Sequence, residues 1–344
     1  MPYLSEEQYY QMVNNPTTCI ARKEDSKTAY FSFSGTYGPD LYSEVERYSI
    51  VAASIADSYS FDAIHCHDWL TYKSGIEAKK ISRKPLVVHV HATEIDRSGY
   101  NNINSLVFEI EKSGMDEADK IVRVSQYTKD ILVKYYHQDP SKIAVVHNGI
   151  DKEPLATKHA KVKKSAKLVT FLGRITHQKG PEYFIEAAAK VLKRCNNVRF
   201  VMAGSGDMLN RCIRHVARLG ISDRFHFTGF LRGKEVHKMF ALSDVYVMPS
   251  ISEPFGISPL EAMQTNVPSI ISKQSGCAEI LKYALKVDFW DVDAMSDAIY
   301  GLLQYPAISN LAARCGYDEV NNIKWNDVAA KIKGIYQEVI DKNK

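Results

Sequence analysis

Short apolar runs, many of them β-branched, alternate along the chain with stretches of helical periodicity. The first group of runs comprises residues 61–67, 85–92, 120–125 and 142–149. The second group comprises residues 167–173, 198–204, 224–229, 244–250 and 267–272. Nearly continuous apolar strands followed by helices are typical of parallel sheets that are buried on both faces. The pattern therefore predicts an α/β protein with two doubly wound, Rossmann-like parallel-sheet domains.

Helical periodicity is clear in two places. After Gly180 and Pro181, apolar residues recur at helical spacing, and a proline suits the first turn of a helix; these residues are Ile185, Ala188, Ala189 and Leu192. The same spacing recurs near the carboxyl end, at Val328, Ile332, Ile335 and Val339. We expect this last helix, within residues 323–344, to pack back toward the first domain.

Residues 151–167 separate the two groups of strands. This segment is rich in lysine, contains one proline and shows no periodicity, as expected of a linker. We predict an N-terminal domain at 1–152 and a C-terminal domain at 153–322. Ligands of such sheets bind outside the carboxyl ends of the strands, so the site is expected in a cleft that both domains face.

Composition narrows the class of protein. The chain has 344 residues, a formal net charge of +4 at pH 7 and scattered basic residues, which gives no indication of a nucleic-acid partner. Its six cysteines form no CxxC pair and predict reduced thiols in a cytoplasmic protein. No apolar run approaches the roughly 18–20 residues of a membrane span, and the polar first residues do not resemble a signal peptide.

The stretch SEPFGISPLEAM, residues 252–263, contains two carboxylates eight positions apart, Glu253 and Glu261. It follows an apolar strand, so we expect a strand-to-helix loop in which Ser258 caps the helix and Pro259 is its first residue. The helix terminus suits a phosphate, and the carboxylates can accept hydrogen bonds from sugar hydroxyls. Taken alone, Glu253 could be an ordinary solvated residue of a loop, and Glu261 could be an acid favoured by the helix dipole. Neither explanation accounts for the whole twelve-residue pattern.

Two further loops follow predicted strands. Residues 171–182 place Arg174 and Lys179 after a strand and before a helix, where two cations suit a diphosphate. Two ordinary surface cations explain that stretch equally well. Residues 203–208, AGSGDM, form a glycine turn that is too short for a dinucleotide fingerprint.

Two pairs of histidines end two predicted strands of the first domain. His65 and His67 share one face of their strand, and His89 and His91 share one face of theirs. Four imidazoles at adjacent strand ends could bind zinc. A histidine that closes an apolar strand more often hydrogen-bonds within the cleft or core, so we expect no metal here.

Taken together, these residues resemble a retaining glycosyltransferase of the GT-B fold. The resemblance is to glycosyltransferase family 4, in its glycogen and starch synthase-like branch, and covers about residues 41–336. The matching stretches are FDAIHCHDWLTY, VVHVHATEIDRSG, VVHNGID, FLGRITHQKG, AGSGD, MPSISEPFGISPLEAM and SGCAEIL. The pair of glutamates with PFG between them is highly specific, and the upstream GR and KG add independent weight.

The resemblance implies roles for individual positions. Glu253 would hold hydroxyls of the donor sugar, and Arg174 and Lys179 would neutralise the leaving diphosphate. His91 would lie at the reacting sugar, and Glu261 would bind the ribose. The turn and loop residues that would contact the nucleotide sugar are Gly173, Gly204, Phe255, Gly256, Ile257 and Ser258.

The implied reaction moves a hexose, with glucose expected, from a nucleoside diphosphate sugar to a glycan or small hydroxyl acceptor. Protein cations and the helix terminus would take the leaving-group charge, so no metal or other cofactor is expected. Retention implies attack from the same face, with a diphosphate oxygen accepting the acceptor's proton. A GT-B epimerase shares the fold, but the two-glutamate motif fits transferases better.

The beginning of the chain departs from the family pattern. Family members open with a strand and a glycine-rich loop, whereas the first thirty residues show neither, and residues 34–40 lead directly into a helical stretch at 41–56. This implies an incomplete N-terminal domain, with one further strand at 29–34. Its open sheet edge would favour self-association or a partner chain. The alternative function is a nucleotide-sugar-binding fragment, or part of a split enzyme, with little activity alone.

Overall fold

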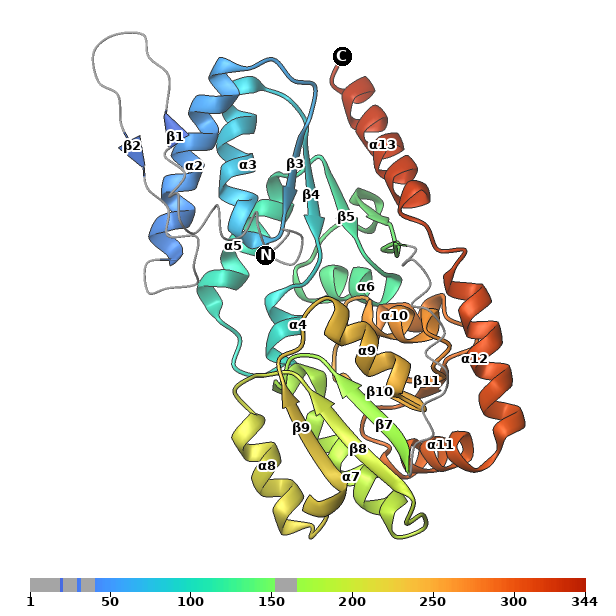
Figure 1. Ribbon diagram of the computed structural model, residues 1–344. Helices are drawn as coiled ribbons and strands as arrows, with labels where there is room; N and C mark the ends of the chain where they lie inside the picture. Colours follow the sequence, from blue (N-terminus) through green and yellow to red (C-terminus); the bar gives the residue numbers. More distant parts are fainter. Residues whose placement is uncertain (1–18, 21–29, 32–40, 152–165) are drawn as a thin grey trace.

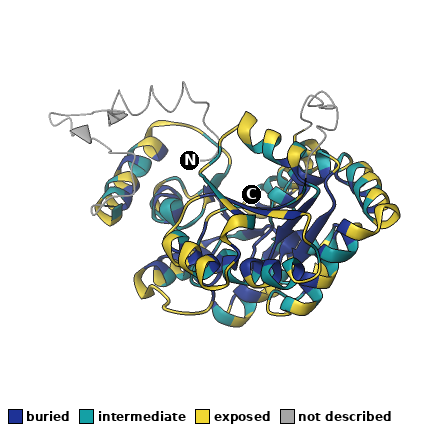
Figure 2. Cartoon of the chain, turned by 60° about the horizontal axis from the view of Figure 1, so that its bottom comes forward, coloured by how far each residue is buried: buried dark blue, intermediate teal, exposed yellow. Residues whose placement is uncertain are grey.

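A computed structural model of the chain describes residues 19–20, 30–31, 41–151 and 166–344 (Figure 1). Within them, two parallel sheets of four and six strands are each flanked by helices, which confirms the predicted α/β class. Buried residues follow the strands, and exposed residues lie on the outer helices (Figure 2). The predicted linker and glycine-loop region lie largely outside the described residues.

The first sheet has the strand order β3-β4-β5-β6, all parallel. Its strands are β3 (Ile64–His67), β4 (Leu86–Val90), β5 (Lys120–Arg123) and β6 (Ile143–Val145). Its helices are α2 (Leu41–Ser58), α3 (Trp69–Ser82), α4 (Glu94–Ser98), α5 (Ser105–Glu117), α6 (Gln126–Tyr135) and η1 (Pro140–Lys142), a short 3-10 helix. Tyr72, Met115 and Leu132 bring α3, α5 and α6 into the core on one face of this sheet.

The second sheet has the order β12-β11-β10-β7-β8-β9 and is also parallel. Its strands are β7 (Lys167–Leu172), β8 (Val198–Ala203), β9 (Phe225–Gly229), β10 (Val245–Met248), β11 (Ser269–Ser272) and β12 (Leu285–Val287). The apolar pattern did not predict β12, because it has three residues with a lysine in the middle. The other strands fall within the predicted runs.

Two cores lie on opposite faces of the second sheet. On β10, Val245 and Val247 face one core, whereas Tyr246 and Met248 face the other, because successive side chains of a strand point to opposite faces. The surrounding helices are α7 (Pro181–Leu192), α8 (Leu209–Arg218), α9 (Lys234–Leu242), α10 (Ser258–Gln264), α11 (Val292–Gln304) and α12 (Pro306–Val320). Three 3-10 helices complete the set: η2 (His177–Lys179), η3 (Ser222–Arg224) and η4 (Gly276–Glu279).

The last helix, α13 (Trp325–Lys342), returns to the first sheet. Ile335 and Val339 are buried against Val87, Val122 and Val146, which point away from the core on the other face of that sheet. The apolar stripe read from the sequence therefore covers a sheet face that would otherwise be exposed. Its carboxyl end lies beside the N-terminal half of the molecule in Figure 1.

The strand predicted at 29–34 differs from expectation. Residues Tyr30–Phe31 (β2) pair antiparallel with Cys19–Ile20 (β1), in a two-stranded sheet separate from the first parallel sheet. A strand is thus present at two of the predicted positions, and the other positions of 29–34 lie outside the described residues. Its backbone hydrogen bonds go to a nearby segment of the chain and not to the parallel sheet. Among the helices that the structure describes, none is both long enough and apolar enough to cross a membrane.

Candidate active site

Two glycine loops meet at the carboxyl ends of β7 and β8. The Gly173 N–H donates to the Ala203 carbonyl at 3.0 Å, and the Ile175 N–H donates to the Ser205 carbonyl at 2.8 Å. Gly204 has φ +144°, and a Cβ there would lie 1.9 Å from the Gly173 carbonyl oxygen. Since any side chain would prevent this approach, glycine at 204 holds the two predicted loops together.

Lys179 and Glu253 form an ion pair across the site. Lys179 ends η2, Glu253 lies in the loop after β10, and Lys179 Nζ is 2.5 Å from Glu253 Oε2. The Ser250 hydroxyl donates to the same oxygen at 3.3 Å. The Glu253 side chain is 9% exposed, so the ammonium compensates a carboxylate that is largely removed from water.

Gln178 joins the cationic loop to the acidic loop. Arg174, which is exposed, donates from Nη2 to Gln178 Oε1 at 3.2 Å. Gln178 donates from Nε2 to the Ser252 carbonyl at 3.0 Å, and its own carbonyl accepts from the Ile251 N–H. Sequence reasoning missed Gln178; the only signal was a polar residue between the two predicted cations.

The turn after Glu253 supplies backbone rather than side chains. The Phe255 side chain is buried in the core beside Leu260 and Cys277, so only its backbone can face a ligand. Gly256 has φ +95°, a left-handed conformation that favours glycine, and a Cβ there would lie 3.1 Å from Glu253 Cγ. Together with Ile257, which is half-buried, these residues form the tight turn that precedes α10.

The predicted capping role of Ser258 was wrong. The helix begins at Ser258, so Ile257 occupies the N-cap position and Pro259 is the second helical residue. Ile257 has helical dihedrals, φ −78° and ψ −34°. Among the described residues, no side chain caps this helix. The Ser258 side chain is half-buried at this end of the helix.

Tyr246, on β10, is buried in the core with Phe255 and Leu260. Burial raises its pKa well above the usual value, and the charges of Glu253 and Glu261 raise it further. Its hydroxyl donates to the Leu172 carbonyl at 3.4 Å. Glu261 itself is half-buried in the first turn of α10. Sequence reasoning did not identify Tyr246, because its position on an apolar strand looks like that of any core residue.

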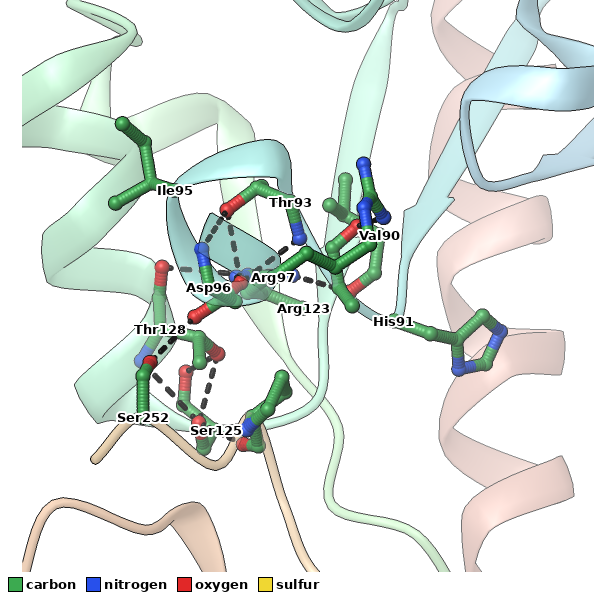
Figure 3. A network of polar contacts seen from close by, with 12 residues as sticks. Val90, His91, Thr93, Ile95, Asp96, Arg97, Arg123, Ser125, Thr128 and Ser252 are labelled. Carbon is green, nitrogen blue, oxygen red and sulfur yellow. Dashed lines mark hydrogen bonds and ion pairs between the residues drawn. The ribbon is translucent and has the colours of Figure 1, made fainter. Parts of the chain in front are cut away.

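His91 lies directly after β4 in the first domain. Its backbone N–H donates to Asp68 Oδ1 at 2.8 Å, and its Nε2 shares a hydrogen bond of 2.9 Å with His67 Nδ1. Burial lowers the pKa of His91, partly opposed by Asp68, so the imidazole is neutral near pH 7. Its side chain points away from the buried network shown in Figure 3.

That network is centred on Asp96, which is fully buried. One of its carboxylate oxygens accepts from Arg123 Nη2 and from the N–H and hydroxyl of Thr93, each at 2.8 Å. The other accepts from the Ser252 hydroxyl at 3.0 Å. Arg123 also donates to the Val90 carbonyl at 2.8 Å. Asp96 therefore links the segment that carries the predicted histidine to the loop that carries the predicted donor acid (Figure 3).

Sequence comparison assigns both halves of the chain to glycosyltransferases. Residues 152–319 match the family described as glycosyl transferases group 1, and residues 30–154 match the one described as glycosyltransferase family 4. An uncharacterized glycosyltransferase of Methanocaldococcus jannaschii is 32% identical over 301 residues, covering 80% of this chain and 75% of that protein. The chain belongs to the glycosyltransferases.

Two other proteins are similar to this glycosyltransferase in sequence or in structure. Glycogen synthase of Mycobacterium tuberculosis is 25% identical over 288 residues, which cover 81% of this chain and 69% of that protein. The Anabaena protein HepE, solved in complex with UDP and glucose, superposes with a TM-score of 0.73 at 17% identity, covering 88% of this chain and 83% of that one. The structural likeness confirms the GT-B fold.

A second contact joins the domains of the glycosyltransferase. Glu279, in η4, accepts hydrogen bonds from the N–H groups of Gln126 and Tyr127 at 2.9 and 2.6 Å, at the N-terminus of α6. It also pairs with His147 Nε2 at 2.8 Å. Glu279 lies in the matching stretch SGCAEIL, but its bond to the other domain was not predicted.

The four histidines of the first domain gather in one stack. One ring nitrogen from each of His65, His67 and His89 lies within 4.8 Å of the others. His67 lies opposite His89 in the register of β3 and β4, which accounts for their proximity. The sequence placed these residues correctly at adjacent strand ends, but it could not show which of their nitrogens lack partners.

Proposed function

We propose that this glycosyltransferase moves a hexose from a nucleoside diphosphate sugar to a hydroxyl of a glycan or small molecule, with retention of configuration. The observation that carries the proposal is the ion pair of Lys179 with Glu253 at the end of the second sheet. Arg174 is tied to the same loop, and Glu261 begins the helix that follows. Cations that suit a diphosphate and carboxylates that suit sugar hydroxyls are thus found in the loops after β7 and β10 and at the start of α10.

Donor binding would rearrange this ion pair. Lys179 would turn from Glu253 to the diphosphate, and Glu253, released from the ammonium, would accept hydrogen bonds from donor-sugar hydroxyls. Arg174 is exposed and can reach the same diphosphate. Glu261 would accept hydrogen bonds from the ribose. A Cβ at Gly173 would meet nothing within 4 Å, so this loop leaves room for the ligand to approach the backbone.

In the transfer step, the bond between the anomeric carbon and the diphosphate oxygen breaks, and its electron pair stays on the diphosphate. The acceptor oxygen bonds the same carbon from the same face, and its proton passes to the leaving diphosphate oxygen. Lys179 and Arg174 stabilise the charge that grows there, so the step needs no metal or other cofactor. His91, neutral at pH 7, would hydrogen-bond the reacting sugar.

Glucose and UDP are the first candidates for the donor. The similarity to a protein named glycogen synthase supports glucose, and HepE, of the same fold, was solved with UDP and glucose. Free thiols at Cys66, Cys195, Cys212, Cys277 and Cys315 support a reducing, cytoplasmic location. Self-association or a partner chain at the β3 edge also remains a proposal; sedimentation as a monomer at all concentrations would count against self-association.

The experiment is a panel of UDP- and ADP-sugars, followed first by melting temperature and then by transfer. A bound donor should raise the melting temperature. UDP-glucose or ADP-glucose should do so and should yield an α-linked product with a glucan or another hydroxyl acceptor. Binding without transfer to any acceptor would favour the alternative, a nucleotide-sugar-binding protein with little activity alone. No response to any nucleotide sugar would contradict the proposal.

A further inference from the structure

The four-histidine stack is only partly used by the proposed transfer. The rings of His65 and His67 lie 4.3 Å apart between centroids, and those of His89 and His91 lie 4.2 Å apart. Across the two strands, the centroids of His67 and His89 are 5.1 Å apart. Only His91 has a role in the transfer step, so the other three imidazoles need a separate explanation.

Buried nitrogens in this stack lack hydrogen-bond partners. His89 is 6% exposed, and within the described part of the chain neither of its ring nitrogens has a partner. Nε2 of His65 is buried and unpartnered in the same way. Buried polar atoms are nearly always satisfied in folded proteins, because leaving them unpaired is costly. Three unpaired nitrogens on two adjacent side chains therefore point to a missing ligand.

Two of the rings have one nitrogen engaged in a hydrogen bond. Nδ1 of His65 hydrogen-bonds the Tyr336 hydroxyl of α13, and Nδ1 of His67 bonds Nε2 of His91. Histidines that bind metals usually engage their second nitrogen in such a bond, which fixes the ring and its tautomer. In His65 this bond leaves the buried Nε2 as the nitrogen that can bind a ligand.

We propose that His65, His67 and His89 form a binding site for one divalent transition-metal ion, with zinc the first candidate. Their ligand nitrogens lie within 4.8 Å of one another. To form zinc–nitrogen bonds of about 2.0–2.1 Å, these nitrogens must approach to about 3.3 Å and the stacked rings must turn toward the ion. Imidazole ligands favour zinc, copper or nickel over magnesium and calcium. His67 is exposed, so the fourth position opens to solvent.

This site replaces the expectation that the histidines bind no metal, while the transfer step itself still needs none. Burial, with a smaller contribution from neighbouring imidazoles, lowers the pKa of His65 to about 4 and of His89 to about 2. Both are therefore neutral at pH 7, and the neutral ring is the form that binds a metal. The purely structural alternative is a stack of neutral rings with no affinity for metal ions.

The test uses the full chain without a histidine tag, stripped with a chelator. Equilibrium dialysis against zinc measures stoichiometry and affinity, and cobalt(II) reports imidazole coordination through its visible absorption. We expect one ion per chain. His67→Gln, at an exposed position that tolerates change, and His65→Gln should each weaken affinity tenfold or more. His226→Gln, an exposed histidine on β9, is the matched control and should bind as the unaltered chain does.

Binding well below one ion per chain would overturn the proposal, as would equal affinity in all three variants, since that would mean adventitious binding elsewhere. Circular dichroism and melting temperature check that each variant folds. Because the readouts are dialysis and absorption, the result does not depend on the proposed transfer activity.

Discussion

At the residue scale, the ion pair of Lys179 with Glu253 joins two loops that are 74 residues apart in sequence. The carboxylate is largely buried, and the ammonium is the cation that compensates it. A donor that supplies a diphosphate for Lys179 and hydroxyls for Glu253 would satisfy both groups at once. The pair thus keeps charged groups in place before the ligand arrives, which lowers the cost of binding.

Glu261→Ala should weaken binding of UDP or ADP by about 1–3 kcal/mol, because a hydrogen bond to a charged acceptor is lost. Calorimetry with the nucleoside diphosphate measures this change, and the melting temperature should move little. Glu109→Ala, at an exposed position on α5, is the control. Unchanged nucleotide affinity in the first variant would remove Glu261 from the site.

Lys179→Ala should lower kcat at least tenfold, because negative charge on the diphosphate is greatest in the transition state. Steady-state kinetics with the preferred donor gives kcat and KM separately. Lys193→Ala, an exposed lysine just after α7, should leave both unchanged. A raised KM with unaltered kcat would show that Lys179 serves ground-state binding alone.

At the scale of elements, the N-terminus of α6 receives the carboxylate of Glu279 from the other domain. Burial by itself would raise the pKa of Glu279, but hydrogen bonds from His147, Tyr127 and Gln126 outweigh it and bring the pKa below the usual 4.5. A helix N-terminus favours an anion, so α6 and η4 stabilise each other only while this carboxylate is ionised.

Glu279→Gln should therefore lower the melting temperature at neutral pH, corresponding to about 1 kcal/mol for a partly exposed group. Because the folded-state pKa is depressed, the stabilisation is present above the unfolded value of 4.5 and disappears as the pH falls through the folded value. The two proteins should thus converge in strong acid. A constant difference at every pH, measured by thermal melts with Glu109→Gln as control, would argue against this linkage.

At the scale of the whole molecule, Asp96 holds the two domains through Ser252 and holds the first sheet through Arg123. Both members of the Asp96–Arg123 pair are fully buried. The ion pair lies within the first domain, whereas the serine bond crosses to the second. The ion pair and the serine bond should contribute differently to the free energy of unfolding, and substitutions at Asp96 and Ser252 can separate the two contributions.

Asp96→Ala should lower the free energy of unfolding by about 3–5 kcal/mol, because it leaves the Arg123 charge buried and unpaired. Ser252→Ala removes the bond to Asp96 and a longer one, of 3.4 Å, from the Tyr127 hydroxyl, and should cost about 1 kcal/mol. Chemical denaturation followed by circular dichroism measures both. Equal losses in the two variants would mean that the buried charge is compensated by another group.

The sequence by itself determined the class of fold and predicted where the site would lie. Periodicity is a local property, so runs such as 198–204 and the stripe of α13 predict elements without knowledge of their neighbours. Parallel strands bring their carboxyl ends to one edge, so loops after strands predict a common site. Arg174, Lys179 and Glu253 could therefore be grouped, although they lie far apart in the chain.

Only the tertiary structure decided which atoms meet. The short β12 pairs because β11 offers an edge, not because its residues favour a strand. Gln178, Tyr246 and Asp96 matter through contacts with residues distant in sequence, and no local pattern encodes such contacts. The ring nitrogens of His89 are buried without partners because α13 packs on the sheet that carries this residue. Each element alone would leave these nitrogens in water, so their burial is a property of the packed molecule.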